Sequence, residues 1–190
     1  NSGNKMMLRF LPYKVWLKKI MRFGEWYKDL NQVMSNSTRD QFNDLLRSEG
    51  LNAGIIPVSN IPNEESRLNE VNRLGILNRD LDQEAQYNAL TQLAAIITKS
   101  QIGLINILGS NIQQCKTNFG FNVLESTLTE EMPREISICQ YSLASPQEPL
   151  IINDLFLDER TKHFKKLEAY ENLRFYAGSP LISSRGFSIG

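Results

Sequence analysis

Large apolar residues near the N-terminus recur at alternating spacings of four and three positions over residues 12–34. They are Trp16, Ile20, Phe23, Tyr27, Leu30 and Met34. This spacing is typical of the a/d seam of a heptad repeat and predicts one helix with a single apolar stripe. The stripe has three interpretations: a dimerisation or signalling seam, packing on the chain's own domain, or, because the segment is basic and aromatic, contact with an anionic membrane surface.

A short helix and a linker follow the seam. Ser37 and Asp40 have the spacing of a capping box for a helix through Leu46, which we expect Gly50 to end. The next dozen residues are rich in Gly and Pro, as linkers are. The pattern therefore divides the chain into a helical segment (1–50), a linker (51–62) and a domain (63–190).

Within that domain, helical and strand periods alternate. Helices are expected from Asn63 to Gly75, from Asp80 or Asp82 through Ile97, from Pro133 through Leu143, and over 159–171. Strands are expected over 102–108, 112–116, 149–152 and 173–183, with a last one at Phe187, and 117–132 is expected to be a loop. This order predicts an α+β domain with an antiparallel sheet covered by helices.

The second of these helices has an apolar face at helical spacing. Leu90, Leu93, Ala94 and Ile97 define it, and Ala95 and Ile96 add to it. We expect this face to be buried.

Composition excludes several classes of protein. The hydrophobic share of 41% is ordinary for a globular chain, and a formal net charge of zero gives no indication of nucleic-acid binding. Residues 1–34 are locally basic, with seven Lys or Arg against two acidic residues. Cys115 and Cys139 are too few for a disulfide scaffold, so we expect both to be reduced and the protein to be cytoplasmic.

Targeting signals are not evident. No run approaches the roughly 18 consecutive apolar residues of a membrane span, and the Asn-Ser-Gly start precedes no apolar signal-peptide core. We expect the sequence to be a piece of a longer protein.

Six segments resemble, in order, motifs of the GAF domain family. They are Glu64–Leu68 with Leu74–Leu77, Leu90–Ala95, Ile102–Leu108, Arg134–Cys139, Leu150–Asp154 with Asp158–Arg160, and Arg174–Leu181. The last one reads Arg-Phe-Tyr-Ala-Gly-Ser-Pro-Leu and is close to the family's R-F-Y-A-G-x-P-L. The resemblance covers 63–190 and implies a GAF-like central antiparallel sheet of five to six strands flanked by helices. It also implies a final strand beyond residue 190.

The resemblance implies a non-catalytic sensory module that binds a small molecule, dimerises, or does both, and that signals to an output domain. A cytosolic two-component phosphorelay protein is the host expected first. The alternatives are the regulatory part of a cyclic-nucleotide or cyclic-dinucleotide synthase or phosphodiesterase, and a ligand-free dimerisation module.

The sequence lacks the motifs with which members of the family bind bilins and cyclic nucleotides. Bilin-binding members carry a Cys in the region that holds His163 and Phe164, so no covalent bilin is expected. The cyclic-nucleotide signature N-K…F-x-x-x-D-E is broken after Phe164. The sequence therefore does not identify a ligand.

No enzymatic motif is present in the sequence. His163 is the only histidine and stands among lysines, so we expect it at the surface, and we expect no catalytic residue and no metal site. A nucleophile elbow, a P-loop and a C-x-x-C motif are all missing.

Six residues are candidates for lining a ligand pocket: Cys139, Asn153, Asp154, Asp158, Arg174 and Tyr176. Cys139 is either a small buried apolar residue or a pocket-lining or redox-sensing thiol. The Asn and Asp residues follow a strand and either contact a polar ligand or form turns and caps. Arg174 and Tyr176 either hold an anionic ligand or form an ordinary rim of the sheet.

Overall fold

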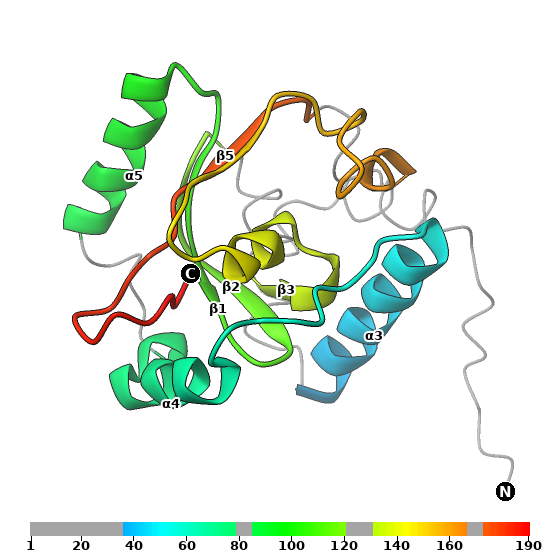
Figure 1. Ribbon diagram of the computed structural model, residues 1–190, viewed down its shortest axis with the longest axis horizontal. Coiled ribbons are helices and arrows are strands. Elements are labelled where there is room, and N and C mark those ends of the chain that lie inside the picture. Colours follow the sequence, from blue (N-terminus) through cyan, green and yellow to red (C-terminus); the bar gives the residue numbers. More distant parts are fainter. Residues whose placement is uncertain (1–35, 79–84, 121–130, 167–172) are drawn as a thin grey trace, which may run out of the picture.

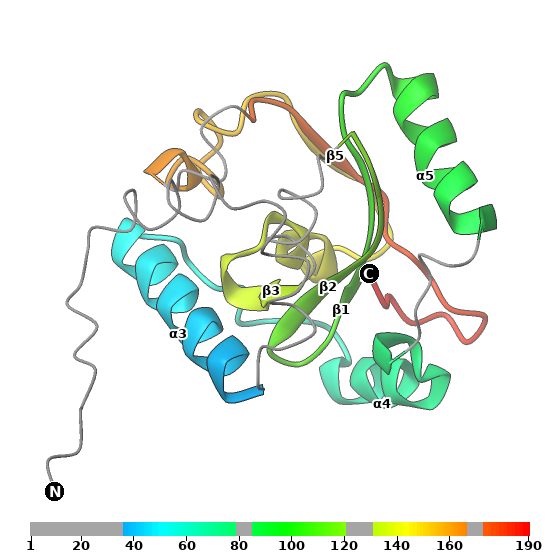
Figure 2. The same ribbon diagram turned by 180° about the vertical axis from the view of Figure 1, so that it is seen from behind.

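The computed structural model describes residues 36–78, 85–120, 131–166 and 173–190 (Figure 1). The predicted helix over 12–34, with its apolar seam, lies outside these residues, as do Asp80 and Asp82. Two layers of helical segments enclose β-structure. Helices α4 and α5 lie on one side, and α3 with the short helices after β3 lies on the other (Figures 1 and 2).

Helix α3 spans Asn36–Ala53, so the prediction that Gly50 ends it is wrong. Gly50 is buried inside the helix, and a Cβ built there would lie 2.2 Å from Cγ2 of Ile136. The glycine permits close packing on the segment after β3. The helix ends at Gly54 instead, where φ is 96° and an L side chain would be strained.

Helix α4 spans Glu64–Leu74 and ends at Gly75, as predicted, with the left-handed φ of 60° that glycine favours. Asn63 precedes it, but its side chain makes no capping bond. The buried face holds Arg67, Glu70 and Val71, so two of its three residues are charged. The 3-10 turn η1 (Ile76–Asn78) follows.

Helix α5 spans Ala85–Thr98, but the prediction that its apolar face is buried is wrong. Its buried residues are Thr91 and Ala95. The large apolar residues are exposed: Leu90 by 56%, Leu93 by 51%, Ile96 by 59% and Ile97 by 70%. The helix therefore faces the sheet with its small residues.

The β-structure forms two antiparallel sheets, which corrects the expected single sheet of five to six strands. One has the order β1-β2-β3, with β1 Gly103–Leu108, β2 Ile112–Phe119 and β3 Glu131–Pro133. The other pairs β4 (Leu150–Ile152) with β5 (Tyr176–Gly178). The predicted hairpin and the strand at 149–152 are confirmed, whereas β2 is longer than expected and β3 falls in a predicted loop.

Irregular backbone connects the two sheets. Leu108 N donates to Ile189 O at 3.0 Å, and Leu181 N donates to Gly190 O at 2.8 Å. Ile182 and Ser188 form an isolated bridge. The segment 187–190 thus lies between β1 and the chain that leaves β5, but it does not form a continuous ladder, so the sheets stay distinct.

The short helices on the second side are of the 3-10 type. The helix predicted after Pro133 is present as η2 (Arg134–Ile136) and η3 (Ile138–Ala144). The helix predicted over 159–171 is not formed in its described part, which consists of turns and η4 (Phe164–Lys166). The backbone there makes i→i+3 bonds, such as Phe164 N to Thr161 O at 2.9 Å, because Phe164 turns inward and is fully buried.

Two hydrophobic clusters hold the layers together. The larger contains Ile55, Ile136, Ile138, Leu150, Ile152, Leu155 and Phe164. The smaller packs α4 on β1 through Val71, Ile107 and Ile189. In the described part of the chain no helix combines the length and the apolarity that crossing a bilayer requires.

Candidate functional site

Strand β1 carries one polar residue inside an apolar run, Asn106. Side chains alternate between the faces of a strand, and Ile107 packs with Val71 under α4. Asn106 and Leu108 therefore point to the opposite face, toward η3. The register shifts between Ile105 and Asn106, so a bulge stands directly before this position.

Three segments converge on the thiol of Cys139 in η3. The Asn106 side-chain amide donates to Sγ of Cys139 at 3.3 Å, and the Tyr176 hydroxyl donates to the same atom at 3.2 Å. Burial raises the pKa of the Cys139 thiol, and the hydrogen bonds from Tyr176 and Asn106 offset this only in part. The thiol therefore stays protonated at neutral pH, which favours hydrogen bonding over nucleophilic or redox chemistry.

Two buried carbonyl oxygens on this sheet face have no hydrogen-bond partner among the residues that the structure describes. One is Oδ1 of Asn106, and the other is Oε1 of Gln113, a residue only 5% exposed. Gln113 pairs with Leu108 in the ladder, and Asn106 pairs with Cys115, so Gln113 and Asn106 share a face. Buried unpaired acceptors are costly, and a donor from a ligand or water would relieve that cost. Asn106, Cys139 and Tyr176, which are joined by hydrogen bonds, together with Gln113 on the same sheet face as Asn106, are hereafter called the β1 polar cluster.

The β1 polar cluster carries no charged side chain. It offers two carbonyl acceptors, a thiol and a hydroxyl, so it suits a neutral group that donates hydrogen bonds. Of the six predicted pocket residues, Cys139 and Tyr176 belong to this cluster, and Arg174 and Asp154 form a separate pair.

Arg174 and Asp154 contact each other away from this cluster. Arg174 forms an ion pair with Asp154, its Nε lies 3.1 Å from Oδ1, and its guanidinium lies 4.8 Å from the centre of the Phe156 ring. The hydrogen bond from Arg174 lowers the pKa of Asp154, and the Phe156 backbone N–H contributes further. The Arg174 side chain is 61% exposed, so its charge is directed to solvent.

Asp158 and Asn153 also stand apart. Asp158 accepts from the backbone and the side chain of Arg160, each at 2.9 Å, which is a local turn interaction. Asn153 is exposed. His163, expected at the surface, is partly buried, and a Cβ on Gly54 would lie 3.0 Å from its Nδ1.

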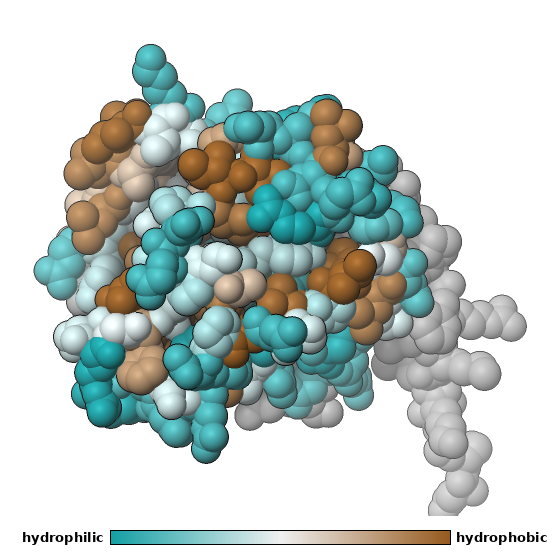
Figure 3. Space-filling model, in the orientation of Figure 1, coloured by the Kyte–Doolittle hydropathy of each residue, from teal (hydrophilic) through white to brown (hydrophobic). Residues whose placement is uncertain are grey.

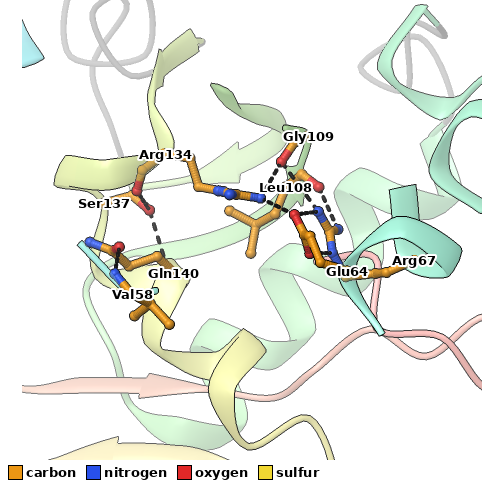
Figure 4. Close-up of polar contacts among 8 residues, drawn as sticks. All are labelled: Val58, Glu64, Arg67, Leu108, Gly109, Arg134, Ser137 and Gln140. Atoms are coloured by element: carbon orange, nitrogen blue, oxygen red, sulfur yellow. Dashed lines mark hydrogen bonds and ion pairs between the residues drawn. The ribbon is translucent and has the colours of Figure 1, made fainter. Parts of the chain in front are cut away.

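A separate ionic network anchors α4 beneath the β1–β2 turn (Figure 4). Arg67, with a side chain 2% exposed, bonds Glu64, the Leu108 carbonyl at 2.6 Å and the Gly109 carbonyl at 3.3 Å. Arg134 bonds Glu64 and Gly109 O as well. Partial burial raises the pKa of Glu64, but the hydrogen bonds from Arg67 and Arg134 outweigh it and lower the pKa overall. This network joins three segments and is structural.

The same view shows how the segment before α4 is tied to η3 (Figure 4). The Gln140 side chain accepts from Val58 N at 2.8 Å and donates to Glu135 O at 2.6 Å. Ser137 caps η3 by accepting from Gln140 N at 3.3 Å. These bonds hold η3, and with it Cys139, in place against β1.

Sequence reasoning missed Asn106 and Gln113. The available signal was a lone Asn in the apolar strand Gly-Leu-Ile-Asn-Ile-Leu, and Gln113 had no signal of its own. Their shared face follows from the register of the hairpin, which the sequence pattern did not specify.

No family model matches this chain. It is similar to the cyclic di-GMP phosphodiesterase PA2567 of Pseudomonas aeruginosa, with 27% identity over 127 residues. The match covers 67% of this chain and 20% of the relative, so the chain corresponds to about one fifth of that protein. The similarity is therefore distant and partial.

Proposed function

We propose that this chain is a non-catalytic GAF-type regulatory module of a signalling protein related to the cyclic di-GMP phosphodiesterases. The distant match to one such enzyme over a small part of its length supports this host better than a two-component phosphorelay. The ordered GAF-like motifs, from Glu64–Leu68 to Arg174–Leu181, support the domain type. Catalysis would then lie in another part of the parent protein.

The observation that carries a ligand-binding role is the β1 polar cluster. Buried acceptors without partners are rare in folded proteins. Among the described residues, two of them lie on one sheet face, and one of these belongs to Asn106, which bonds the Cys139 thiol. A ligand with N–H or O–H donors would satisfy them. The guanine base, which carries N–H donors, is one such group, and the relative's substrate contains it.

Thermal unfolding with cyclic di-GMP and cyclic GMP tests this role. A ligand that binds only the folded state raises the midpoint with its concentration, and we expect at least one of these probes to do so. Asn106→Leu should abolish the shift because it removes the acceptor, whereas the exposed Asn60→Leu should leave it intact. Native mass spectrometry of the purified chain would weigh any copurifying ligand. Unshifted midpoints with both probes and a ligand-free mass would contradict ligand binding and favour a purely dimerising module.

Incubation with cyclic di-GMP tests the non-catalytic part of the proposal. We expect no linear product by chromatography, with or without divalent metal. Product formation by the purified chain, lost after heat denaturation, would overturn it.

A further inference from the structure

The pair of strands β4 and β5 has two different faces. On the outer face, Ile151 and Phe175 are 58% and 52% exposed, and Figure 3 shows apolar side chains at the surface in this region. On the inner face, Tyr176 lies opposite Ile152 and packs against the larger hydrophobic cluster. Side chains alternate along a strand, so Gly178, two residues after Tyr176, belongs to the inner face as well.

The ring of Tyr176 lies across Gly178. A Cβ built at Gly178 would lie 2.7 Å from Oη of Tyr176, 3.0 Å from its Cε1 and 3.1 Å from its Cζ. These three atoms form the hydroxyl end of one ring, and real Cβ atoms essentially never approach another atom as closely as 2.7 Å. The absence of a side chain at position 178 therefore provides the space that the hydroxyl end of Tyr176 occupies.

The backbone at this position does not itself require glycine. The φ angle of Gly178 lies outside the left-handed region, and its neighbour across the ladder is Leu150 in β4. Glycine inside a strand is unfavourable, because it loses conformational entropy and has no side chain to pack. The close approach of the Tyr176 ring is therefore the steric reason for a glycine at position 178.

The same ring position directs the Tyr176 hydroxyl to Cys139. The hydroxyl donates to Sγ of Cys139 at 3.2 Å. A tyrosine ring is rigid, so a methyl group at position 178 could be accommodated only by rotating the whole ring. That rotation would carry the hydroxyl away from Gly178 and change its approach to the sulfur. Tyr176 already packs against buried residues, which limits the alternative positions of the ring.

We propose that Gly178 is a positioning residue that determines the hydrogen-bonding character of the β1 polar cluster, by leaving room for Tyr176 to donate to Cys139. The consequence for a ligand rests on the proposed binding role of this cluster. Because the hydroxyl hydrogen of Tyr176 is used on Cys139, the cluster offers the carbonyl oxygens of Asn106 and Gln113 as acceptors. Gly178 thus acts on specificity through Tyr176, in favour of a ligand that donates hydrogen bonds.

Nuclear magnetic resonance of the chain labelled with ¹³C at tyrosine Cζ tests the positioning role without any ligand. The chain has six tyrosines, and the resonance that disappears in Tyr176→Phe identifies Tyr176. Cys139→Ala removes the acceptor of the hydroxyl, so it should shift this resonance. Gly178→Ala should shift it as well, because the ring moves off the sulfur. Ala177→Val is the matched control, since Ala177 is exposed on the outer face of the same strand, and it should leave the resonance unchanged.

A double-mutant cycle separates contact with the ring from an effect on the strand. Tyr176→Phe removes Oη, the ring atom that would lie nearest to the added Cβ. Gly178→Ala should therefore lower the thermal midpoint less in the Tyr176→Phe background than in the wild type. If Gly178→Ala alone does not fold by circular dichroism, recovery of folding in the double variant supports the proposal, and no recovery contradicts it.

Thermal unfolding with cyclic di-GMP tests the consequence for the ligand. Gly178→Ala should reduce the rise in midpoint that this probe causes in the wild type, whereas Ala177→Val should retain it. A wild type that does not respond to the probe counts against the proposed function alone, because the resonance and the cycle are measured on the free chain.

Three outcomes would overturn the inference. One is a Tyr176 resonance in Gly178→Ala at its wild-type position, which would show that the ring does not move. Another is an equal loss of midpoint from Gly178→Ala in both backgrounds, which would assign the glycine to the strand backbone. The third is a full ligand-induced rise in midpoint in Gly178→Ala, which would separate this residue from the specificity of the cluster.

Discussion

At the scale of single residues, two glycines with positive φ angles differ in their surroundings. Gly54 has a φ of 96° and Gly186 a φ of 82°. A Cβ at Gly54 would lie 3.0 Å from Nδ1 of His163, whereas a Cβ at Gly186 would meet nothing within 4 Å. A side chain at Gly186 would therefore meet backbone strain alone, whereas a side chain at Gly54 would meet backbone strain and steric contact.

We expect Gly186→Ala to lower the free energy of unfolding by about 1 kcal/mol, through the left-handed backbone alone. Gly54→Ala should lower the free energy of unfolding by about 1 kcal/mol more than Gly186→Ala, because the His163 ring must also move. Urea denaturation of both variants measures the difference. Equal losses would mean that the imidazole shifts freely.

The buried carboxylate of Glu70 predicts a pH dependence. Hydrogen bonds from Arg73 and Ser183, with the charges of Arg73 and Arg185, lower its pKa to about 2 from 4.5. A carboxylate with a lowered pKa in the folded state stabilises the protein above its unfolded pKa, and this stabilisation is lost as pH falls from about 4.5 toward 2. Glu70→Gln should flatten the stability profile in that window.

The control for this effect is the exposed Glu65 on the same helix. Glu65→Gln should leave the acid limb of the profile unchanged. Chemical denaturation at a series of acidic pH values gives both curves. If Glu70→Gln loses stability with falling pH as steeply as the wild type does, the pH dependence of stability arises from other carboxylates.

At the scale of elements, α4 is positioned by buried charge as much as by apolar packing. Glu64→Ala leaves Arg67 and Arg134 without their shared carboxylate (Figure 4). Glu64 is 27% exposed, so we expect a loss of about 1–3 kcal/mol, below that of a fully buried pair. Glu65→Ala, one residue along, should change stability by less than about 0.5 kcal/mol. Thermal unfolding compares the two, and equal effects would show that the network contributes no net stability.

Element types were predicted better than element faces. The helix ending at Gly75, the hairpin from Gly103 and the strand Leu150–Ile152 were predicted because local turn chemistry and hydrophobic period decide them. The prediction of which face of α5 is buried was wrong, because the close approach of Thr91 to Gly103 sets the packing of the helix. These two residues are distant in sequence, so a local pattern does not record their contact. The 3-10 turn at Phe164 was missed because burial of one aromatic ring overrides a helical pattern.

At the scale of the whole molecule, the heptad seam over 12–34 stays a prediction, since it lies outside the described residues. Replacing Ile20 and Tyr27 with Asp would remove two seam positions. If the seam contributes to dimerisation, this double variant should raise the dissociation constant at least tenfold in sedimentation velocity. Unchanged association would exclude the seam from the interface.

The sequence by itself determined the α+β class, the order of most elements and two members of the β1 polar cluster, Cys139 and Tyr176. These follow from local periodicity, turn residues and the GAF-like motifs. Only the tertiary structure decided that the strands form two sheets, that Arg174 pairs with Asp154 beside solvent, and that Asn106, which shares a sheet face with Gln113, bonds Cys139. The physical reason is that register, the rotation of helices and hydrogen bonds between distant segments depend on contacts across the chain, which no local pattern records.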